Sequence, residues 1–256
     1  MNGSIEKKDQ DKNIERRILC AIKPDGTREE IEVALIREHS LSVYVDGECI
    51  LKLICTKDLL DELVIGRLCT DGYIKCLDDI SEMRFDENAE RADVSLKYVQ
   101  GEDCSEVGKP NGERSDENAV DAVSIGDKIP QWSVGQIFEL ANTFSKGMPI
   151  HSRTQGTHSC LLARGSEVIF SCEDIGRHNT VDKAVGFALK NHVKLSECIL
   201  FISGRVPVDM MKKVINAGIP VLVSKSVPTA DAVSLAKENG ITLIVKAYPD
   251  QIEICE

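Results

Sequence analysis

The amino-acid sequence predicts an α/β protein in which a smaller N-terminal α+β domain precedes a larger C-terminal α/β domain. From residue 133 onward, apolar runs typical of strands alternate with stretches of helical periodicity. Residues 17–56 instead carry consecutive strand-like runs. An acidic stretch dominated by Gly, Asn, Ser and Glu lies between the two regions. We therefore expect structural units at 17–100, 101–121 and 122–256.

The N-terminal domain is predicted to consist mostly of strands. Strand-like runs cover residues 18–22, 31–36, 41–45, 50–54, 80–85 and 92–99. Asp25-Gly26 and Asp46-Gly47 mark turns between the first four runs. One helix is expected over 57–71, because apolar side chains recur there at helical spacing and Gly72 follows as a stop signal.

The C-terminal domain is predicted to alternate helices with strands. Its first helix begins after Ser133, a good N-cap residue, and stops at Gly147. Further helices are expected after His178, around Met211 and after Thr229. Strands are expected over 158–163, 167–171, 198–202, 221–223, 241–245 and 252–255. This alternation predicts a largely parallel or mixed sheet that is covered on both faces.

Length and charge narrow the functional classes. The chain has 256 residues, a formal net charge of −11 and a pI near 5.1. Its acidity argues against nucleic acid or an anionic membrane as a partner, since phosphate binding depends on an excess of Lys and Arg. No apolar run approaches the roughly 18 residues that span a bilayer, and the charged N-terminus is unlike a signal peptide. We expect a soluble, cytoplasmic protein.

The ten cysteines do not follow a metal-binding pattern. No two of them are separated by the short spacers typical of zinc sites, so no metal is expected. Six lie in apolar segments and are predicted to be buried free thiols. These six are Cys20, Cys49, Cys55, Cys69, Cys160 and Cys198.

Cationic and small residues follow three of the predicted strands. They lie in residues 174–183, in Ser203-Gly204-Arg205 and in Ser224-Lys225-Ser226. Ligands of open α/β sheets bind beyond the carboxyl ends of the strands, where helix N-termini favour anions. We therefore predict one shared pocket for a phosphate-bearing small molecule. Its candidate residues are His158, Arg177, His178, Lys183, Ser203, Arg205 and Lys225.

Individual members of this pocket have structural alternatives. Arg177 could pair with Asp174 or Asp182, and the Ser and Thr residues could simply cap helices. His158 could be a satisfied histidine at the start of a strand. The remaining histidines, His39, His151 and His192, are predicted to lie on the surface. The sequence contains neither a P-loop nor a Rossmann glycine motif.

Cys104 lies in the acidic stretch 101–121, which is predicted to be a mobile, solvated linker or loop. A cysteine in such a segment is accessible and can react. Three acidic neighbours within two residues disfavour its thiolate, and Lys109 is the one cation near them. These residues alone leave an incidental exposed cysteine as the alternative to a nucleophile.

Several motifs together resemble the FdhD family, the formate dehydrogenase accessory sulfurtransferases. The matching segments, in the order of the family, are 41–72, 154–158, 174–186, 203–206 and 224–229. Within the second segment, Gln155 stands in place of a glycine of the family. The resemblance covers about residues 40–245.

This resemblance implies a specific activity. Family members accept sulfur as a persulfide from a cysteine desulfurase and deliver it to the molybdenum bis(molybdopterin guanine dinucleotide) cofactor of formate dehydrogenase. The C-terminal part would have a cytidine-deaminase-like α/β/α fold, and a homodimer is an open alternative to a monomer. Cys104 would carry the sulfur. The cofactor would also contact a segment aligned by position, namely Lys246, Ala247, Tyr248, Pro249, Asp250 and Gln251.

The sequence also departs from the family pattern. The family carries Cys-x-x-Cys in its sulfur-carrying loop, whereas Val107 occupies the place of the second cysteine here. A single thiol can hold a persulfide, but relay between two loop cysteines cannot occur. The alternative function is a cofactor-binding chaperone homologue that has lost sulfur transfer. A third possible function is a nucleotide enzyme that uses His178 and Asp182 for acid–base chemistry. The sequence offers no nucleophile–base pair for such an enzyme.

Overall fold

The structure, a computed structural model, describes residues 11–97 and 132–255. In these residues the strands form a two-stranded hairpin, a four-stranded sheet and a six-stranded sheet. The mixed α/β class that the sequence predicts is therefore confirmed. Residues 101–121, with Cys104, lie outside the described part of the chain, so the linker there stays a prediction.

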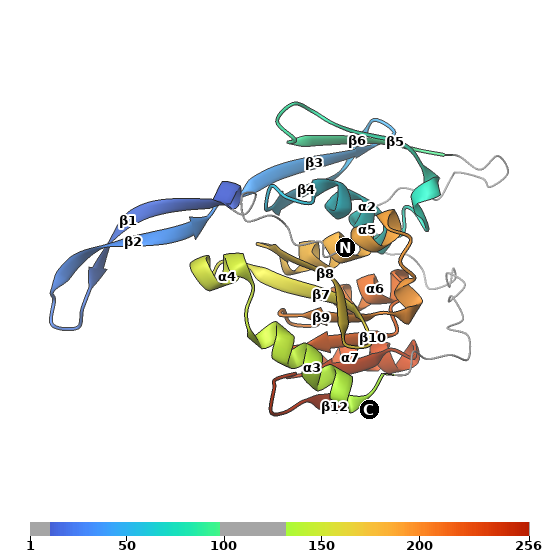
Figure 1. The fold of residues 1–256 in the computed structure, drawn as a ribbon. Helices are drawn as coiled ribbons and strands as arrows, with labels where there is room; N and C mark the ends of the chain where they lie inside the picture. The colour runs from blue at the N-terminus through green and yellow to red at the C-terminus, as the bar shows by residue number, and fades with distance from the viewer. Residues whose placement is uncertain (1–10, 98–131, 256) are drawn as a thin grey trace.

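The two-stranded hairpin projects from the body of the protein (Figure 1). β1 (Ile14–Ile22) pairs antiparallel with β2 (Arg28–Ile36), and the predicted turn at Gly26 has a φ of +84°. Cys20 on β1 is exposed, so its predicted burial is wrong. Within the described residues α4 and the residues after it contact the hairpin at its base, near Ile36, and Cys20 lies toward the exposed turn. Apolar sequence alone does not bury a strand.

The four-stranded sheet has the order β4-β3-β6-β5. Its strands are β3 (His39–Val45), β4 (Glu48–Cys55), β5 (Ile80–Phe85) and β6 (Arg91–Leu96). The short 3-10 helices η1 (Asp11–Asn13) and η2 (Leu77–Asp79) precede β1 and β5. Alternate residues of β3 are buried, because one face of this sheet packs on helices. Cys49 points away from that core and is exposed, against the prediction.

The six-stranded sheet has the order β12-β11-β10-β9-β7-β8. Its strands are β7 (His158–Arg164), β8 (Glu167–Asp174), β9 (Ile199–Ile202), β10 (Val221–Ser224), β11 (Thr242–Val245) and β12 (Glu253–Cys255). β9, β10 and β11 are parallel to one another. β7 pairs antiparallel with β9, β8 pairs antiparallel with β7, and β12 pairs antiparallel with β11. The sheet is therefore mixed, as expected.

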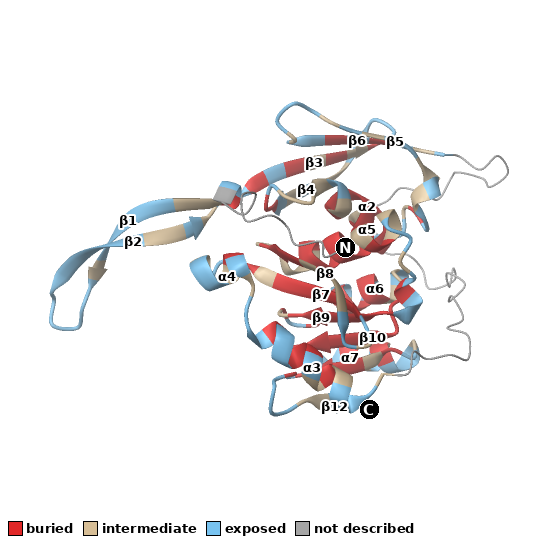
Figure 2. Cartoon of the chain, in the orientation of Figure 1, coloured by how far each residue is buried: buried red, intermediate tan, exposed pale blue. Residues whose placement is uncertain are grey.

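Helices cover both faces of this sheet (Figure 1). α2 (Leu60–Thr70), α5 (Arg177–Lys190), α6 (Val208–Asn216) and α7 (Ala230–Glu238) lie on one side, and α3 (Val134–Ser145) lies on the other. The 3-10 helix η3 (Leu195–Glu197) leads into β9. Along β9, Leu200 and Ile202 join the larger core, while Ile199 and Phe201 join the core under α3. The central strands β9 and β10 are accordingly buried along their whole length, whereas the edge strand β12 is partly exposed (Figure 2).

Most elements lie where the sequence predicts them, but β1 begins four residues before the predicted run 18–22 and β2 three residues before 31–36. Ser133 caps α3 by accepting a hydrogen bond from the Gln136 backbone N–H, and Thr229 caps α7 in the same way. β8 extends further than predicted and ends at Asp174. The helix α4 (Pro149–Thr154) is missed by the prediction, because six residues are too short to show a helical period.

None of the helices in the described residues is long and apolar enough to cross a bilayer.

Candidate functional site

A pocket opens at the edge where β9, β10 and β11 end and β7 begins. Its volume is about 700 Å³. Five of the predicted site residues line it, namely His158, Ser203, Lys225, Lys246 and Tyr248. The three parallel strands bring their carboxyl ends to one edge, and the antiparallel β7 brings its first residue to the same edge. Topology therefore gathers residues that lie far apart in the sequence.

The pocket is cationic although the whole chain is acidic. Lys225, Lys246, His151 and His158 line it, and no carboxylate is found among the described residues of its wall. Lys246 Nζ pairs with Glu253 Oε1 at 3.0 Å outside that wall, so Lys225 supplies most of the pocket's positive charge. Lys225 Nζ lies 5.8 Å from the ring centre of Phe144 and 5.7 Å from that of Tyr248. These aromatic faces position the lysine without neutralising it as a carboxylate would. The arrangement suits an anionic ligand.

His158 and Ser203 form the polar floor of this pocket. Ser203 Oγ lies 3.2 Å from His158 Nδ1 and accepts a hydrogen bond from the Ser159 backbone N–H at 3.0 Å. Burial lowers the pKa of His158, and the charges of Arg177 and His151 lower it further, whereas Asp174 acts in the opposite direction. The imidazole is thus biased toward its neutral form.

Arg177 lies beside the pocket, at the first position of α5. Its aliphatic stem passes over Gly204, where an added Cβ would come within 3.0 Å of Arg177 Cβ. The Arg177 Nε is buried and has no hydrogen-bond partner among the described residues. A buried guanidinium donor without a partner is costly unless a ligand accepts from it. Arg177 is not among the residues that line the pocket, so it acts there through its charge, which reaches His158.

The sequence prediction missed Glu173, a buried carboxylate that holds part of the pocket wall in place. Glu173 accepts hydrogen bonds from the backbone N–H groups of Ile150 and His151 at 2.8 and 2.6 Å, and from Thr157 Oγ1 at 3.0 Å. These contacts hold α4 and the loop after it against β8. His151 consequently lines the pocket and is only partly exposed, so its predicted surface position is wrong. Nothing in the local sequence distinguishes Glu173 from a solvated glutamate.

His39 is also buried rather than on the surface, and its Nε2 lies 2.6 Å from the Ala89 carbonyl oxygen. This histidine belongs to the four-stranded sheet. It therefore has a structural role away from the pocket.

Lys183 does not supply charge to the pocket, contrary to the prediction. It is fully buried, with its Nζ 2.7 Å from Asp174 Oδ2 and 2.8 Å from Thr56 Oγ1. Burial alone would lower the pKa of Lys183, but Asp174 and Asp58 outweigh burial and raise it. Lys183 therefore stays charged and joins α5 to the N-terminal sheet. Asp174 is occupied by this pairing, so Arg177 does not pair with it.

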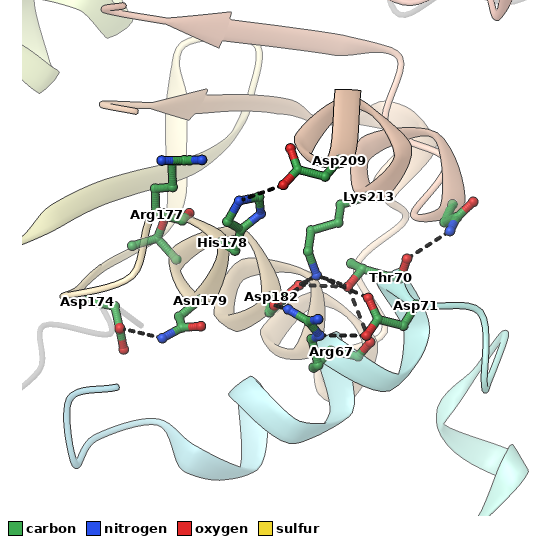
Figure 3. A network of polar contacts seen from close by, with 12 residues as sticks. Arg67, Thr70, Asp71, Asp174, Arg177, His178, Asn179, Asp182, Asp209 and Lys213 are labelled. Carbon is green, nitrogen blue, oxygen red and sulfur yellow. Dashed lines mark hydrogen bonds and ion pairs between the residues drawn. The ribbon is translucent and has the colours of Figure 1, made fainter. Parts of the chain in front are cut away.

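His178 does not line the pocket, and its ring points toward Asp209 of α6 (Figure 3). Its Nε2 lies 3.3 Å from Asp209 Oδ2. Asp182, one turn along α5, is held by Lys213 Nζ at 2.8 Å and by Thr70 Oγ1 at 2.7 Å. His178 and Asp182 are thus committed to separate partners. The geometry does not support the acid–base pair of the third alternative.

The remaining predicted contacts are dispersed. Arg205 is exposed and does not line the pocket. In the predicted C-terminal segment, Ala247 is buried in the core under α3. Pro249, Asp250 and Gln251 are exposed beyond the pocket wall, in a turn closed by a hydrogen bond from the Tyr248 N–H to the Gln251 carbonyl. Only Lys246 and Tyr248 of this segment reach the pocket.

The described cysteines are poorly suited to nucleophilic chemistry where they are buried. Burial raises the pKa of Cys55 to about 12 and that of Cys69 to about 11. Cys160 and Cys198 are buried as predicted. No group of three or more His, Cys, Asp or Glu side chains in the described part of the chain is placed to hold a metal ion.

Comparison with known proteins identifies the family. Residues 36–255 match the FdhD/NarQ family, a match that covers most of the chain. The chain belongs to the FdhD/NarQ family. The resemblance to this family that the sequence motifs indicate is thereby confirmed. The matched residues include every strand that borders the pocket.

Relatives within the FdhD/NarQ family are similar along nearly their whole length. A sulfur carrier protein FdhD from Listeria monocytogenes is 29% identical over 241 residues, which cover 90% of this chain and 92% of the relative. A protein of the same name from Halalkalibacterium halodurans is 30% identical over 241 residues, covering 89% of this chain and 87% of the relative.

The fold is also known from a crystal structure. A proposed formate dehydrogenase accessory protein from Desulfotalea psychrophila superposes with a TM-score of 0.77 at 22% identity, covering 95% of this chain and 96% of that one. This likeness supports the overall α/β architecture.

Gln155, where the sequence resemblance leads us to expect glycine, has a positive φ. Gln155 ends α4 with a φ of +52°, in the left-handed region that glycine occupies most easily. Gln155 nonetheless lines the pocket. Gln155 therefore adopts, at a cost in backbone strain, a conformation that glycine adopts more easily.

Proposed function

We propose that this protein is a cytoplasmic sulfur carrier that passes persulfide sulfur from a cysteine desulfurase to the molybdenum bis(molybdopterin guanine dinucleotide) cofactor of a formate dehydrogenase. The names of its relatives support the sulfur-carrier and formate dehydrogenase parts of this proposal. The helices on both faces of the mixed sheet support a cytidine-deaminase-like arrangement of the C-terminal part.

The observation that carries the proposal is the pocket with cationic walls and no lining carboxylate among the described residues. A guanine dinucleotide carries a diphosphate, which such a wall would bind. Lys225 and the floor at His158 are the groups that would hold its oxygens, and the charge of Arg177 beside the pocket would add to the attraction. The cofactor is here the cargo that receives sulfur, and it supplies the molybdenum that accepts it.

Cys104 is the proposed carrier. Its thiolate would attack the sulfane sulfur of the desulfurase persulfide, form a new S–S bond and release the desulfurase cysteine as a thiolate. The buried thiols of the described core are unsuited to this step, because their raised pKa values leave almost no thiolate at neutral pH.

Sulfur loading can be tested by intact mass spectrometry. The full chain is incubated with a cysteine desulfurase and cysteine, and the same preparations are titrated with GDP. We expect wild type to gain one sulfur atom and Cys104→Ala to gain none. Cys20→Ala and Cys49→Ala are matched controls that should load normally, because they remove other exposed cysteines.

Loading that survives in Cys104→Ala would exclude this residue as the carrier. Failure of wild type to load, with GDP binding intact, would favour the alternative of a cofactor-binding chaperone homologue. That alternative is motivated by Val107, which removes the second cysteine of the family's loop motif. Failure of both loading and GDP binding would reject the proposed function.

A further inference from the structure

We propose that His158 is a proton-linked anion contact, which takes up a proton when a phosphate group enters the pocket and releases it when the ligand leaves. This inference rests on the proposed use of the pocket and goes beyond it, because it assigns a change of charge to one residue. It makes the affinity for the cargo depend on pH.

The first argument is position. His158 opens β7 and lines the pocket, half-buried, directly opposite Asp174 in the register with β8. Its Nδ1 faces Ser203 Oγ at 3.2 Å, and Ser203 is fixed in turn by the Ser159 N–H. With Nδ1 held by the protein, Nε2 is the ring nitrogen left to contact a ligand.

The second argument is that Ser203 accommodates both protonation states. A hydroxyl has one donor and two acceptor lone pairs. When His158 is neutral with its proton on Nε2, Ser203 Oγ–H donates to Nδ1. When His158 is protonated, the hydroxyl rotates and accepts from Nδ1–H while still accepting from the Ser159 N–H. The hydrogen bond at 3.2 Å is kept in either state, so protonation requires no rearrangement of the backbone.

The third argument is the field of the surrounding charges. Arg177 at the start of α5 and His151 on α4 are the cations that act on the ring. Lys225 after β10 and Lys246 after β11 line the same pocket, and Lys246 also pairs with Glu253 at 3.0 Å. Asp174 on β8 is the opposing charge, and Lys183 pairs with it at 2.7 Å. His158 therefore sits in a cationic environment until an anion binds.

These surroundings give the direction of the coupling. In the free protein, burial and then Arg177 and His151 lower the pKa of His158. A bound phosphate places negative charge against the ring and reverses this field, which raises the pKa. Between the two pKa values, binding draws in one proton, so affinity strengthens as pH falls. Above the bound-state pKa and below the free-state pKa, His158 contributes no further change.

The coupling can be measured by titrating the full chain with GDP between about pH 6 and about pH 8.5. Because the terminal phosphate of GDP itself titrates near pH 6, the readout is the affinity of wild type divided by that of His158→Gln at each pH. We expect this ratio to grow toward acidic pH, by about tenfold for each unit by which binding raises the pKa. His192→Gln, on an exposed loop after α5, is the matched control and should follow wild type.

Two further measurements separate this inference from the proposed function. NMR titration of the His158 ring, without and with inorganic pyrophosphate, should show a higher pKa in the complex. Lys225→Met should weaken GDP binding at every pH, whereas Lys237→Met, exposed in the last turn of α7, should not. A ratio independent of pH, or a ring pKa unchanged by pyrophosphate, overturns the role of His158 alone. Absence of binding by both probes overturns the role and the proposed pocket together.

Discussion

At the scale of single residues, the most consequential finding is that similar side chains on α5 have unrelated roles. Arg177 lies beside the pocket with an unpartnered Nε, and His178 pairs with Asp209 on α6. Lys183, five residues after His178, is among the largest fully buried side chains and pairs with Asp174. Sequence position identified this helix start as important. The direction in which each side chain leaves the helix decided what each residue does.

We predict that Lys183→Met destabilises the protein by about 3–5 kcal/mol, since it leaves the buried Asp174 carboxylate without its cation. The measurement is urea unfolding followed by circular dichroism. Lys190→Met is the matched control, on the same helix with the same substitution. Lys190 pairs with Glu62 but is about 30% exposed, so its replacement should cost about 1 kcal/mol or less. Equal losses in the two variants would contradict the buried pair.

At the scale of elements, the contact between α2 and α5 decides how the N-terminal sheet is attached to the larger one. A Cβ added at Gly66 would lie 1.7 Å from the Asp182 carbonyl oxygen, and one added at Gly186 would lie 1.9 Å from that of Glu62. The two helices therefore cross backbone against backbone, with a glycine from each at the contact. This close approach places Thr70 of α2 on Asp182 of α5, and Lys213 of α6 bonds to both.

Substitution of Gly186 by Ala should lower the free energy of unfolding by at least about 1–3 kcal/mol, because the helices must separate to admit the methyl group. Gly135→Ala on α3 is the matched control. The nearest atom to a Cβ there is Ser133 Oγ at 3.8 Å, so helix propensity should dominate and stabilise the variant by about 0.5–1 kcal/mol. Chemical denaturation of both variants measures the difference. If Gly186→Ala left the free energy of unfolding unchanged, the two helices would have to be further apart at this crossing than described.

At the scale of the whole molecule, one hydrophobic core runs across the predicted domain boundary. It includes Leu41, Leu63 and Val94 from the N-terminal part, and Val181 and Leu200 from the C-terminal part. A separate, smaller core fills the space between α3 and the six-stranded sheet. Because the larger core is shared, the N-terminal sheet and the central helices should gain and lose their packing together.

We therefore predict a single cooperative unfolding transition for the described regions. Circular dichroism reports all helices and strands, while the fluorescence of Trp132 reports the core under α3. The two midpoints in urea should coincide. Separate transitions would instead indicate that the two regions unfold independently.

Much of the fold could be predicted because its determinants are local. Alternating apolar runs, caps such as Ser133 and Thr229, and stop glycines such as Gly72 lie within a few residues of the elements they define. The exceptions have physical reasons. α4 is too short to show a period, and the exposed Cys20 and Cys49 lie on strand surfaces that nothing in the described residues covers.

The candidate site, too, has features that follow from local sequence and features that depend on the tertiary structure. The sequence by itself determined the family, the order of strands and helices, and the fact that cationic and hydroxyl residues follow strand ends. Only the tertiary structure decided which of them share a pocket: it brought in His158, Ser203 and Lys225, and it turned His178 and Lys183 toward other partners. The reason is that local sequence fixes backbone geometry, whereas the neighbours of a side chain come from strands and helices distant in the chain.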